Sequence, residues 1–324
     1  MKSKKNLNIK KFLTISQQIE LLKSRNLIFT SENSENKNDE YRFKWYLRLY
    51  NYQDFVKGYN KIFVKNKIKK IRDENTSIVD YENSKSSGII EIFNFDRSVS
   101  NYLFSNILNF ERILKTSIVL AIGTTSKHKT IKNCRLFEID KNEVANELFK
   151  NNLNKNEINK LFESMNSPFK ENIQNNRLIE KYKDNKNIIP LWSLIMFWSF
   201  GTVFKFYSAL KDEYKKEVLK NIFEKNENKR IDINTLEELI GVLKDIRNRI
   251  AHNNRIYDIK IQNKKKILNQ LLHVNKVKSV KKPIKLMDLI SVFELLIINK
   301  KNSNNKTLRE LISDKCNTIF FQII

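Results

Sequence analysis

Apolar residues recur at helical spacing along most of the chain, and the longest such segment covers residues 89–121. Its apolar positions fall on one broad face: Ile92, Phe93, Phe95, Val99, Leu103, Ile107, Phe110, Ile113, Leu114 and Ile118. The pattern predicts one long helix over these residues. Two acid–arginine neighbours within it, Asp96-Arg97 and Glu111-Arg112, are expected to be charge pairs on the helix surface.

Shorter periodic segments predict further helices. Residues 14–26 form a short amphipathic pattern in which Thr14 or Ser16 is the expected N-cap. Other helices are expected at residues 142–150, 155–165, 192–210 and 286–298. With only 5 Gly and 3 Pro, the chain has few positions for the tight turns of hairpins. An all-α fold is therefore predicted.

The segment 188–204 contains 17 residues without a charge, which is close to the shortest length that spans a bilayer as a helix. Lys205 follows it directly, and Ser193, Ser199 and Gly201 dilute its apolar character. A buried core helix is therefore favoured over a membrane span.

Polar stretches suggest how the chain is divided. The segment 73–88 is polar enough to be a linker, so residues 1–88 are interpreted as an N-terminal helical region and residues 89–324 as the main helical domain. Within that domain, residues 126–187 are rich in Asn and Lys, which indicates a polar helical insertion.

The net charge of +25 indicates a polyanionic partner such as RNA or DNA. A lysine excess from AT-rich coding is the alternative, because the lysines are scattered. The candidate RNA contacts in lysine-rich segments are Lys67, Lys69, Lys70, Lys276, Lys278, Lys281 and Lys282, although solvated charge is the ordinary interpretation of each segment.

Cysteine usage and the N-terminus favour the cytoplasm. Cys134 and Cys316 lie far apart without a CxxC spacing, so free thiols are expected rather than a disulfide or a zinc site. The basic N-terminus lacks the apolar run of a signal peptide. No metal or other cofactor is expected.

Aromatic and basic residues alternate over residues 41–56. Such a surface could stack on RNA bases and hold phosphates. However, Phe43, Tyr46, Leu47 and Tyr50 recur at helical spacing, so packing in the core is the favoured interpretation.

The candidate chemistry lies near the end of a helix expected to begin at Thr235 as its N-cap. Its apolar stripe consists of Leu236, Leu239, Ile240, Leu243, Ile246 and Ile250. Arg247 falls inside this stripe, about 40° from Leu243, whereas His252 projects about 140° from Arg247. A guanidinium in that position needs an acceptor, either a carboxylate, a facing subunit or a bound phosphate. The two side chains converge only if the helix ends between them or the arginine curls around.

An arginine followed by a histidine suits phosphodiester chemistry, because arginine binds phosphate and histidine transfers protons near neutral pH. The spacing alone is common by chance. Several segments in order resemble the Abi-like (AbiD/AbiF) abortive-infection proteins of the HEPN superfamily: residues 17–27, Phe95-Asp-Arg97, Pro190-Leu-Trp192, Phe200-Gly-Thr202, residues 246–252 and Arg255-Ile-Tyr257. The chain has Asn253 where that family has a second histidine, and Tyr257-Asp258 where it has Trp-Asn.

The resemblance implies a HEPN-type helical bundle and a metal-independent endoribonuclease in antiphage defence or a toxin-like role, sometimes restrained by a small noncoding RNA. Arg247, Asn248 and His252 would be catalytic, Arg249 and Arg255 would contact RNA, and attack by the 2′-OH would leave a 2′,3′-cyclic phosphate. Because the chain has one such motif and cleavage needs an acid and a base, a homodimer is expected.

Two alternatives remain open. In the first, the protein binds RNA through the same basic surface without cutting it. In the second, it is a purely structural helical protein in which Arg247 neutralises a carboxylate such as Asp96 or Glu111.

Overall fold

The computed structural model describes residues 12–30, 39–64, 79–167, 189–223 and 231–259. The prediction of an all-α fold is confirmed: within these ranges the regular elements are helices, and β-type pairing is limited to the isolated bridges Ile28–Lys85 and Phe149–Leu210. None of the described helices is both long enough and apolar enough to cross a bilayer. The helix expected at residues 286–298 and the candidate lysines 67–70 and 276–282 lie outside the described residues.

Two compact units divide the structure between Ser100 and Asn101, inside helix α5 (Ser86–Thr125). The first turns of α5 thus belong to the N-terminal unit and the remainder to the second unit. The domain boundary expected at residue 88 remains a prediction. Nine of the ten residues expected on the apolar face of α5 are buried, whereas Ile113 is exposed.

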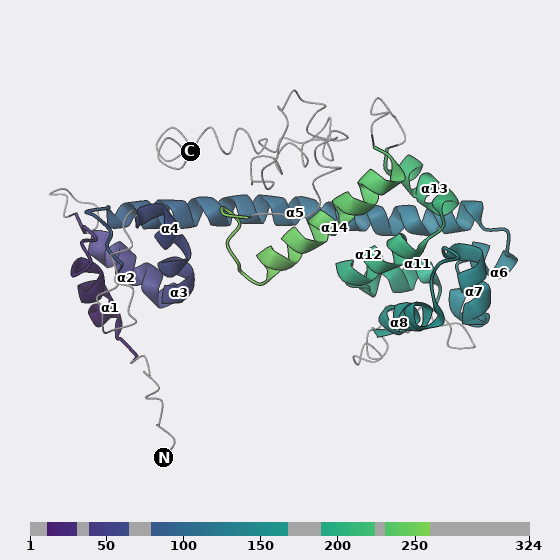
Figure 1. The fold of residues 1–324 in the computed structure, drawn as a ribbon, viewed down its shortest axis with the longest axis horizontal. Coiled ribbons are helices and arrows are strands. Elements are labelled where there is room, and N and C mark those ends of the chain that lie inside the picture. Colours follow the sequence, from purple (N-terminus) through teal and green to yellow (C-terminus); the bar gives the residue numbers. More distant parts are fainter. Residues whose placement is uncertain (1–11, 31–38, 65–78, 168–188, 224–230, 260–324) are drawn as a thin grey trace, which may run out of the picture. The chain divides into compact units, whose positions relative to one another are not determined.

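The described residues of the N-terminal unit form a group of short helices before α5 (Figure 1). They are α1 (Ile15–Lys23), α2 (Asp39–Leu49), α3 (Tyr52–Phe55) and α4 (Asn60–Phe63), with a 3-10 turn, η1, at Lys57–Tyr59. Thr14 is the N-cap of α1, as predicted, and it forms a capping box with Gln17. Satisfied donors at this end fix where the helix starts.

Aromatic rings make the core of this unit. Phe93 of α5 lies 5.3 Å from Phe55 and 6.0 Å from Tyr59 between ring centroids, and Phe43 packs on Phe55. Asp96 is buried beside this cluster, where the Tyr59 hydroxyl donates to its Oδ2 at 3.0 Å. The expectation that Asp96 forms a surface charge pair is therefore wrong, because the helices before α5 cover this position.

After the remainder of α5, the second unit continues with the elements of the polar insertion: α6 (Lys129–Lys132), η2 (Leu136–Glu138), α7 (Lys141–Leu148) and α8 (Lys155–Met165). Helices α7 and α8 confirm the two weak helices predicted there. Then follow α11 (Leu191–Leu194), η4 (Ile195–Phe197), α12 (Phe200–Ala209), α13 (Asp212–Ile222) and α14 (Ile233–Ala251). Helix α12 contacts both α8 and α14, and α13 also contacts α14.

The single helix predicted for residues 192–210 is wrong. The backbone is extended at Trp198 and Ser199, and the Ser199 hydroxyl accepts the N–H of Thr202 at 3.1 Å, which caps a new helix. Serine competes for backbone donors in this way and divides an otherwise apolar run. Burial of the run is confirmed, since Leu194, Trp198 and Phe206 are all buried.

Cys134 is a buried free thiol, and burial raises its pKa. Cys316 lies outside the described residues.

Candidate functional site

Helix α14 carries the candidate residues at its C-terminal end, and its start is fixed by Asp232. The Asp232 carboxylate accepts the N–H of Thr235 at 2.7 Å, so Asp232 is the N-cap and the prediction of Thr235 is wrong. Thr235, three residues after the N-cap, is buried. Hydrogen bonds from the Thr235 side chain and backbone lower the pKa of Asp232.

The predicted apolar stripe of α14 is confirmed. Its six members are buried: Leu236, Leu239, Ile240, Leu243, Ile246 and Ile250. Arg247 lies within this stripe and is partly buried, whereas Asn248 and His252 are exposed. The stripe therefore carries a cation next to the packed face of the helix.

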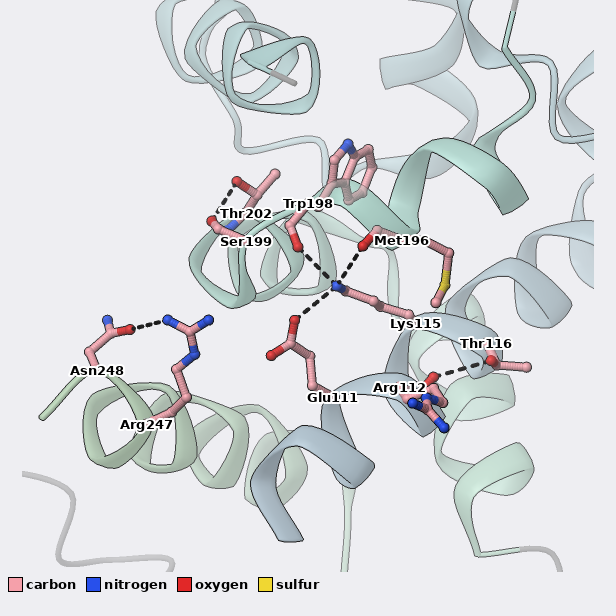
Figure 2. A network of polar contacts seen from close by, with 10 residues as sticks. All are labelled: Glu111, Arg112, Lys115, Thr116, Met196, Trp198, Ser199, Thr202, Arg247 and Asn248. Carbon is pink, nitrogen blue, oxygen red and sulfur yellow. Dashed lines mark hydrogen bonds and ion pairs between the residues drawn. The ribbon is translucent and has the colours of Figure 1, made fainter. Parts of the chain in front are cut away.

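Arg247 uses little of its donor capacity. Its Nη1 donates to Oδ1 of Asn248 at 3.3 Å (Figure 2). Its Nε is buried and has no hydrogen-bond partner within the described residues. A guanidinium has five N–H donors, so most of its fork remains for another acceptor. In the described ranges Arg247 forms no ion pair, and the described carboxylates Asp96 and Glu111 therefore do not neutralise it there.

Lys115 of α5, a second cation close to this region, has an acceptor for each N–H donor of its ammonium group. Its Nζ lies 2.8 Å from Oε1 of Glu111 and donates to the carbonyl oxygens of Trp198 at 2.9 Å and Met196 at 3.3 Å. Lys115 and Glu111 are both buried. Glu111 therefore pairs inside the protein with Lys115, and the expectation of a surface pair with Arg112 is wrong.

Glu111 retains one unused acceptor. Its Oε2 is buried without a hydrogen-bond partner among the described residues. Figure 2 shows the Glu111 carboxylate and the Arg247 guanidinium projecting from α5 and α14 into the same region, beside the start of α12. There the hydroxyls of Ser199 and Thr202 lie 3.1 Å apart. The region thus presents a buried donor and a buried acceptor, each with spare capacity.

The sequence contains a signal for this buried pair, although a surface pair was predicted. At 100° per residue, Glu111 lies about 20° from Ile118 and about 60° from Leu114, inside the apolar face of α5. A Glu–Lys pair four residues apart within such a face indicates a buried pair rather than a solvated one.

Helix α14 ends at Ala251, between Arg247 and His252. His252 is the C-cap, and Asn253 adopts a left-handed conformation with φ of 56°. The N–H of Asn253 donates to the carbonyl of Ile250 at 2.8 Å, and that of Asn254 donates to the carbonyl of Arg249 at 3.0 Å. This is a Schellman motif, for which asparagine is suited. Although the helix ends between Arg247 and His252, no side-chain hydrogen bond joins the two residues in the described structure.

Asp258 organises the loop that follows the helix. Arg249 Nη2 lies 3.4 Å from Oδ1 of Asp258, and Arg255 Nε lies 3.5 Å from the same oxygen. Arg249 Nε also donates to the carbonyl of Arg255 at 2.6 Å. Both arginines proposed as RNA contacts therefore take part in loop structure as well, while remaining about one-third exposed.

No cluster of His, Cys, Asp or Glu side chains in the described ranges has an arrangement suited to a metal ion. The chemistry available at this site is that of an arginine, an amide and an imidazole.

The all-helical fold and the Arg–Asn–His end of α14 define a class of helical proteins with a basic motif at the end of a core helix. The family model described as Abi-like protein matches residues 45–258, which is most of the chain and includes the whole motif. The chain therefore belongs to the Abi-like family, whose function is related to abortive infection. Comparison with curated proteins and with solved structures gave no match.

Proposed function

We propose that this protein is a metal-independent endoribonuclease of the HEPN type that acts in abortive infection or a similar toxin-like response in the cytoplasm. The observation that carries the proposal is the state of Arg247. A partly buried guanidinium bonds only to the neighbouring Asn248 and keeps a buried, unpaired Nε in the described structure. A phosphate is the acceptor that matches such a fork.

The residues support a balanced reaction. One imidazole removes the proton of a ribose 2′-OH, and the 2′-oxygen attacks the adjacent phosphorus. The bond from phosphorus to the 5′-oxygen breaks, and that oxygen takes a proton from a second imidazole. The products are a 2′,3′-cyclic phosphate and a 5′-OH, and the chemistry requires RNA because DNA lacks the nucleophile.

Each residue has a distinct task in this mechanism. Arg247 stabilises the negative charge that develops on the phosphate oxygens. Asn248 accepts a hydrogen bond from Nη1 at 3.3 Å and so orients the guanidinium. His252 transfers the proton, and its exposed position at the C-cap leaves the ring accessible to RNA.

A homodimer supplies the second imidazole. General acid and general base are separate tasks, and the motif occurs once per chain. In one chain, α14 remains helical through Ala251, so the geometry favours a site shared between copies related by a two-fold axis. RNA would be the substrate, and a small noncoding RNA is a further proposed partner that restrains the enzyme.

The nuclease proposal is tested with purified full-length protein and end-labelled RNA. Cleavage products ending in a cyclic phosphate are expected from the wild type and should be lost with His252→Ala. His128→Ala, at the other described histidine, is the matched control and should cut normally. RNA that is bound but never cut by the wild type would instead identify a noncatalytic RNA-binding protein.

The shared site makes a separate quantitative prediction. Wild-type chains are unfolded and refolded together with increasing amounts of His252→Ala chains, so that the copies mix. If each site needs both imidazoles, activity falls as the square of the wild-type fraction. A linear fall, or a strict monomer by light scattering with and without RNA, would contradict the composite site.

A further inference from the structure

One face of α2 is exposed although it is rich in aromatic and apolar side chains. Tyr41, Trp45 and Leu49 are 59%, 50% and 55% exposed. They recur every four residues and form a stripe along the helix. The core is served by another face of the same helix, through Phe43 and Leu47, which are buried. The interpretation of residues 41–56 as core packing therefore holds for only part of α2.

The exposed stripe forms part of the lining of a hollow in the surface. An open hollow of about 470 Å³ is lined by Tyr41, Arg42, Trp45, Tyr46, Leu49 and Tyr50. Residues of α5 hold the rings of Tyr46 and Tyr50 in place. Tyr46 accepts a hydrogen bond from Nδ2 of Asn94 at 2.8 Å, and Tyr50 packs on Phe93 with ring centroids 4.6 Å apart. The floor is thus held by the N-terminal core while the Trp45 and Tyr41 rings reach solvent.

Positive charge flanks the stripe on both sides. At 100° per residue the three exposed side chains span about 80°, with Arg48 about 20° beyond one edge and Arg42 about 20° beyond the other. Both arginines are exposed, and neither forms an ion pair with the described residues. Lys44, about 60° from Tyr41 around the helix, is paired with Glu40 at 2.6 Å. The free cations therefore gather beside the exposed rings.

We infer that this face of α2 binds single-stranded RNA by stacking bases on Trp45 and Tyr41 while Arg42 and Arg48 contact phosphates. Exposed rings with flanking arginines are the means by which proteins hold unpaired bases. Successive members of the stripe rise about 6 Å along the helix. That is close to twice the spacing of about 3.4 Å per nucleotide layer, which leaves room for one base between neighbouring rings. A polyanion also suits a chain with a net charge of +25.

This inference rests on the proposed function, because it names a surface through which the same RNA is held. Binding of a fluorescein-labelled oligouridine is measured by anisotropy with full-length protein in the His252→Ala background, which prevents cutting. Adding Trp45→Ala is expected to weaken binding roughly tenfold, since one stacked base is lost. Trp45→Phe, which keeps a ring, should retain affinity within about threefold. Trp192→Ala removes a tryptophan that is 46% exposed in the second unit and should leave affinity unchanged.

A second measurement does not depend on how the variants fold. Oligonucleotides that carry 4-thiouridine are crosslinked to the protein, and the attached peptide is identified by mass spectrometry. Crosslinks within residues 41–50 support the surface. Crosslinks confined to other segments overturn it, as does unchanged affinity in Trp45→Ala.

Two further results separate this inference from the proposed function. If Trp45→Ala binds RNA normally while otherwise wild-type protein still yields cyclic phosphates, the α2 surface is refuted and the nuclease stands. If Trp45→Ala converts a dimer into a monomer by light scattering without changing RNA affinity, the face is a contact between copies and the inference is overturned.

Discussion

Two cations of the second unit, Lys115 and Arg247, differ in how completely they are paired (Figure 2). All three N–H donors of the Lys115 ammonium have an acceptor: Glu111 and the carbonyls of Met196 and Trp198. Arg247 has one hydrogen bond, to Asn248, and its buried Nε has no partner in the described ranges. The fold therefore supplies all the hydrogen-bond acceptors of Lys115 but only one acceptor of Arg247.

On the proposed function, this difference separates a structural charge from one that is available to bind a ligand. A buried charge is tolerated when every hydrogen bond is made, and it then links the elements that supply the acceptors. Lys115 joins α5 to the junction between η4 and α12 in this way. A cation left with free donors beside a packed face costs free energy, and that cost is recovered when a ligand arrives.

Lys115→Met gives the largest predicted effect. The substitution keeps an unbranched apolar stem, one heavy atom shorter than lysine, but leaves the buried Glu111 carboxylate and two carbonyls without their donor. The free energy of unfolding should fall by about 3–5 kcal/mol, as is usual when one partner of a buried pair is removed. Urea or thermal unfolding of the full chain measures this loss.

Arg112→Met is the matched control, because it removes a positive charge from the adjacent turn of the same helix. Arg112 is exposed, so the loss should stay within about 0.5 kcal/mol. Equal effects for the two substitutions would show that net charge, and not the buried network, determines the stability.

The sequence predicted those parts of the fold that periodicity governs. Nine of ten expected positions on α5 are buried because a broad apolar stripe leaves one way to pack. The prediction from periodicity failed at the start of α12, where the Ser199 hydroxyl interrupts an apolar run of residues. A single hydroxyl that caps a helix has little weight in a pattern of hydrophobicity, so the break is visible only once the backbone is known.

For the candidate site, too, one part could be predicted from the sequence and another part could not. The position of Arg247 within the stripe of α14 followed from angles along the helix, but the hydrogen bonds of Lys115 depend on carbonyls 81 and 83 residues away. No local pattern contains such distant acceptors. The left-handed conformation of Asn253, which completes the end of the helix, is likewise known only from the backbone.

The other end of α14 offers a smaller test of the same comparison. Asp232→Ala removes the acceptor of the Thr235 N–H and should lower the free energy of unfolding by about 1 kcal/mol at pH 7. Asp232→Asn keeps an N-cap and should cost less.

The contribution of Asp232 should depend on pH in a defined direction. Its pKa is lowered in the folded protein, so the carboxylate contributes fully above the unfolded pKa of about 3.9 and loses its contribution as the pH falls through the folded value. The difference between wild type and Asp232→Asn, measured by urea unfolding, should therefore be constant near neutrality and disappear in acid. A difference that grows on acidification would contradict the assignment of Asp232 as the charged cap.

Arg247→Met should give the smallest change in stability, within about 0.5 kcal/mol, because no described ion pair is lost and a buried unpaired donor is removed. Cleavage of RNA should nevertheless fall about 100-fold or more, as when a donor to a developing oxyanion is removed. The decisive comparison pairs each cation with Glu111→Gln in a double-mutant cycle. Lys115 and Glu111 should be strongly coupled, whereas Arg247 and Glu111 should show almost no coupling. Strong coupling of Arg247 to Glu111 would instead make Arg247 a structural cation, and its effect on cleavage would then follow from the fold.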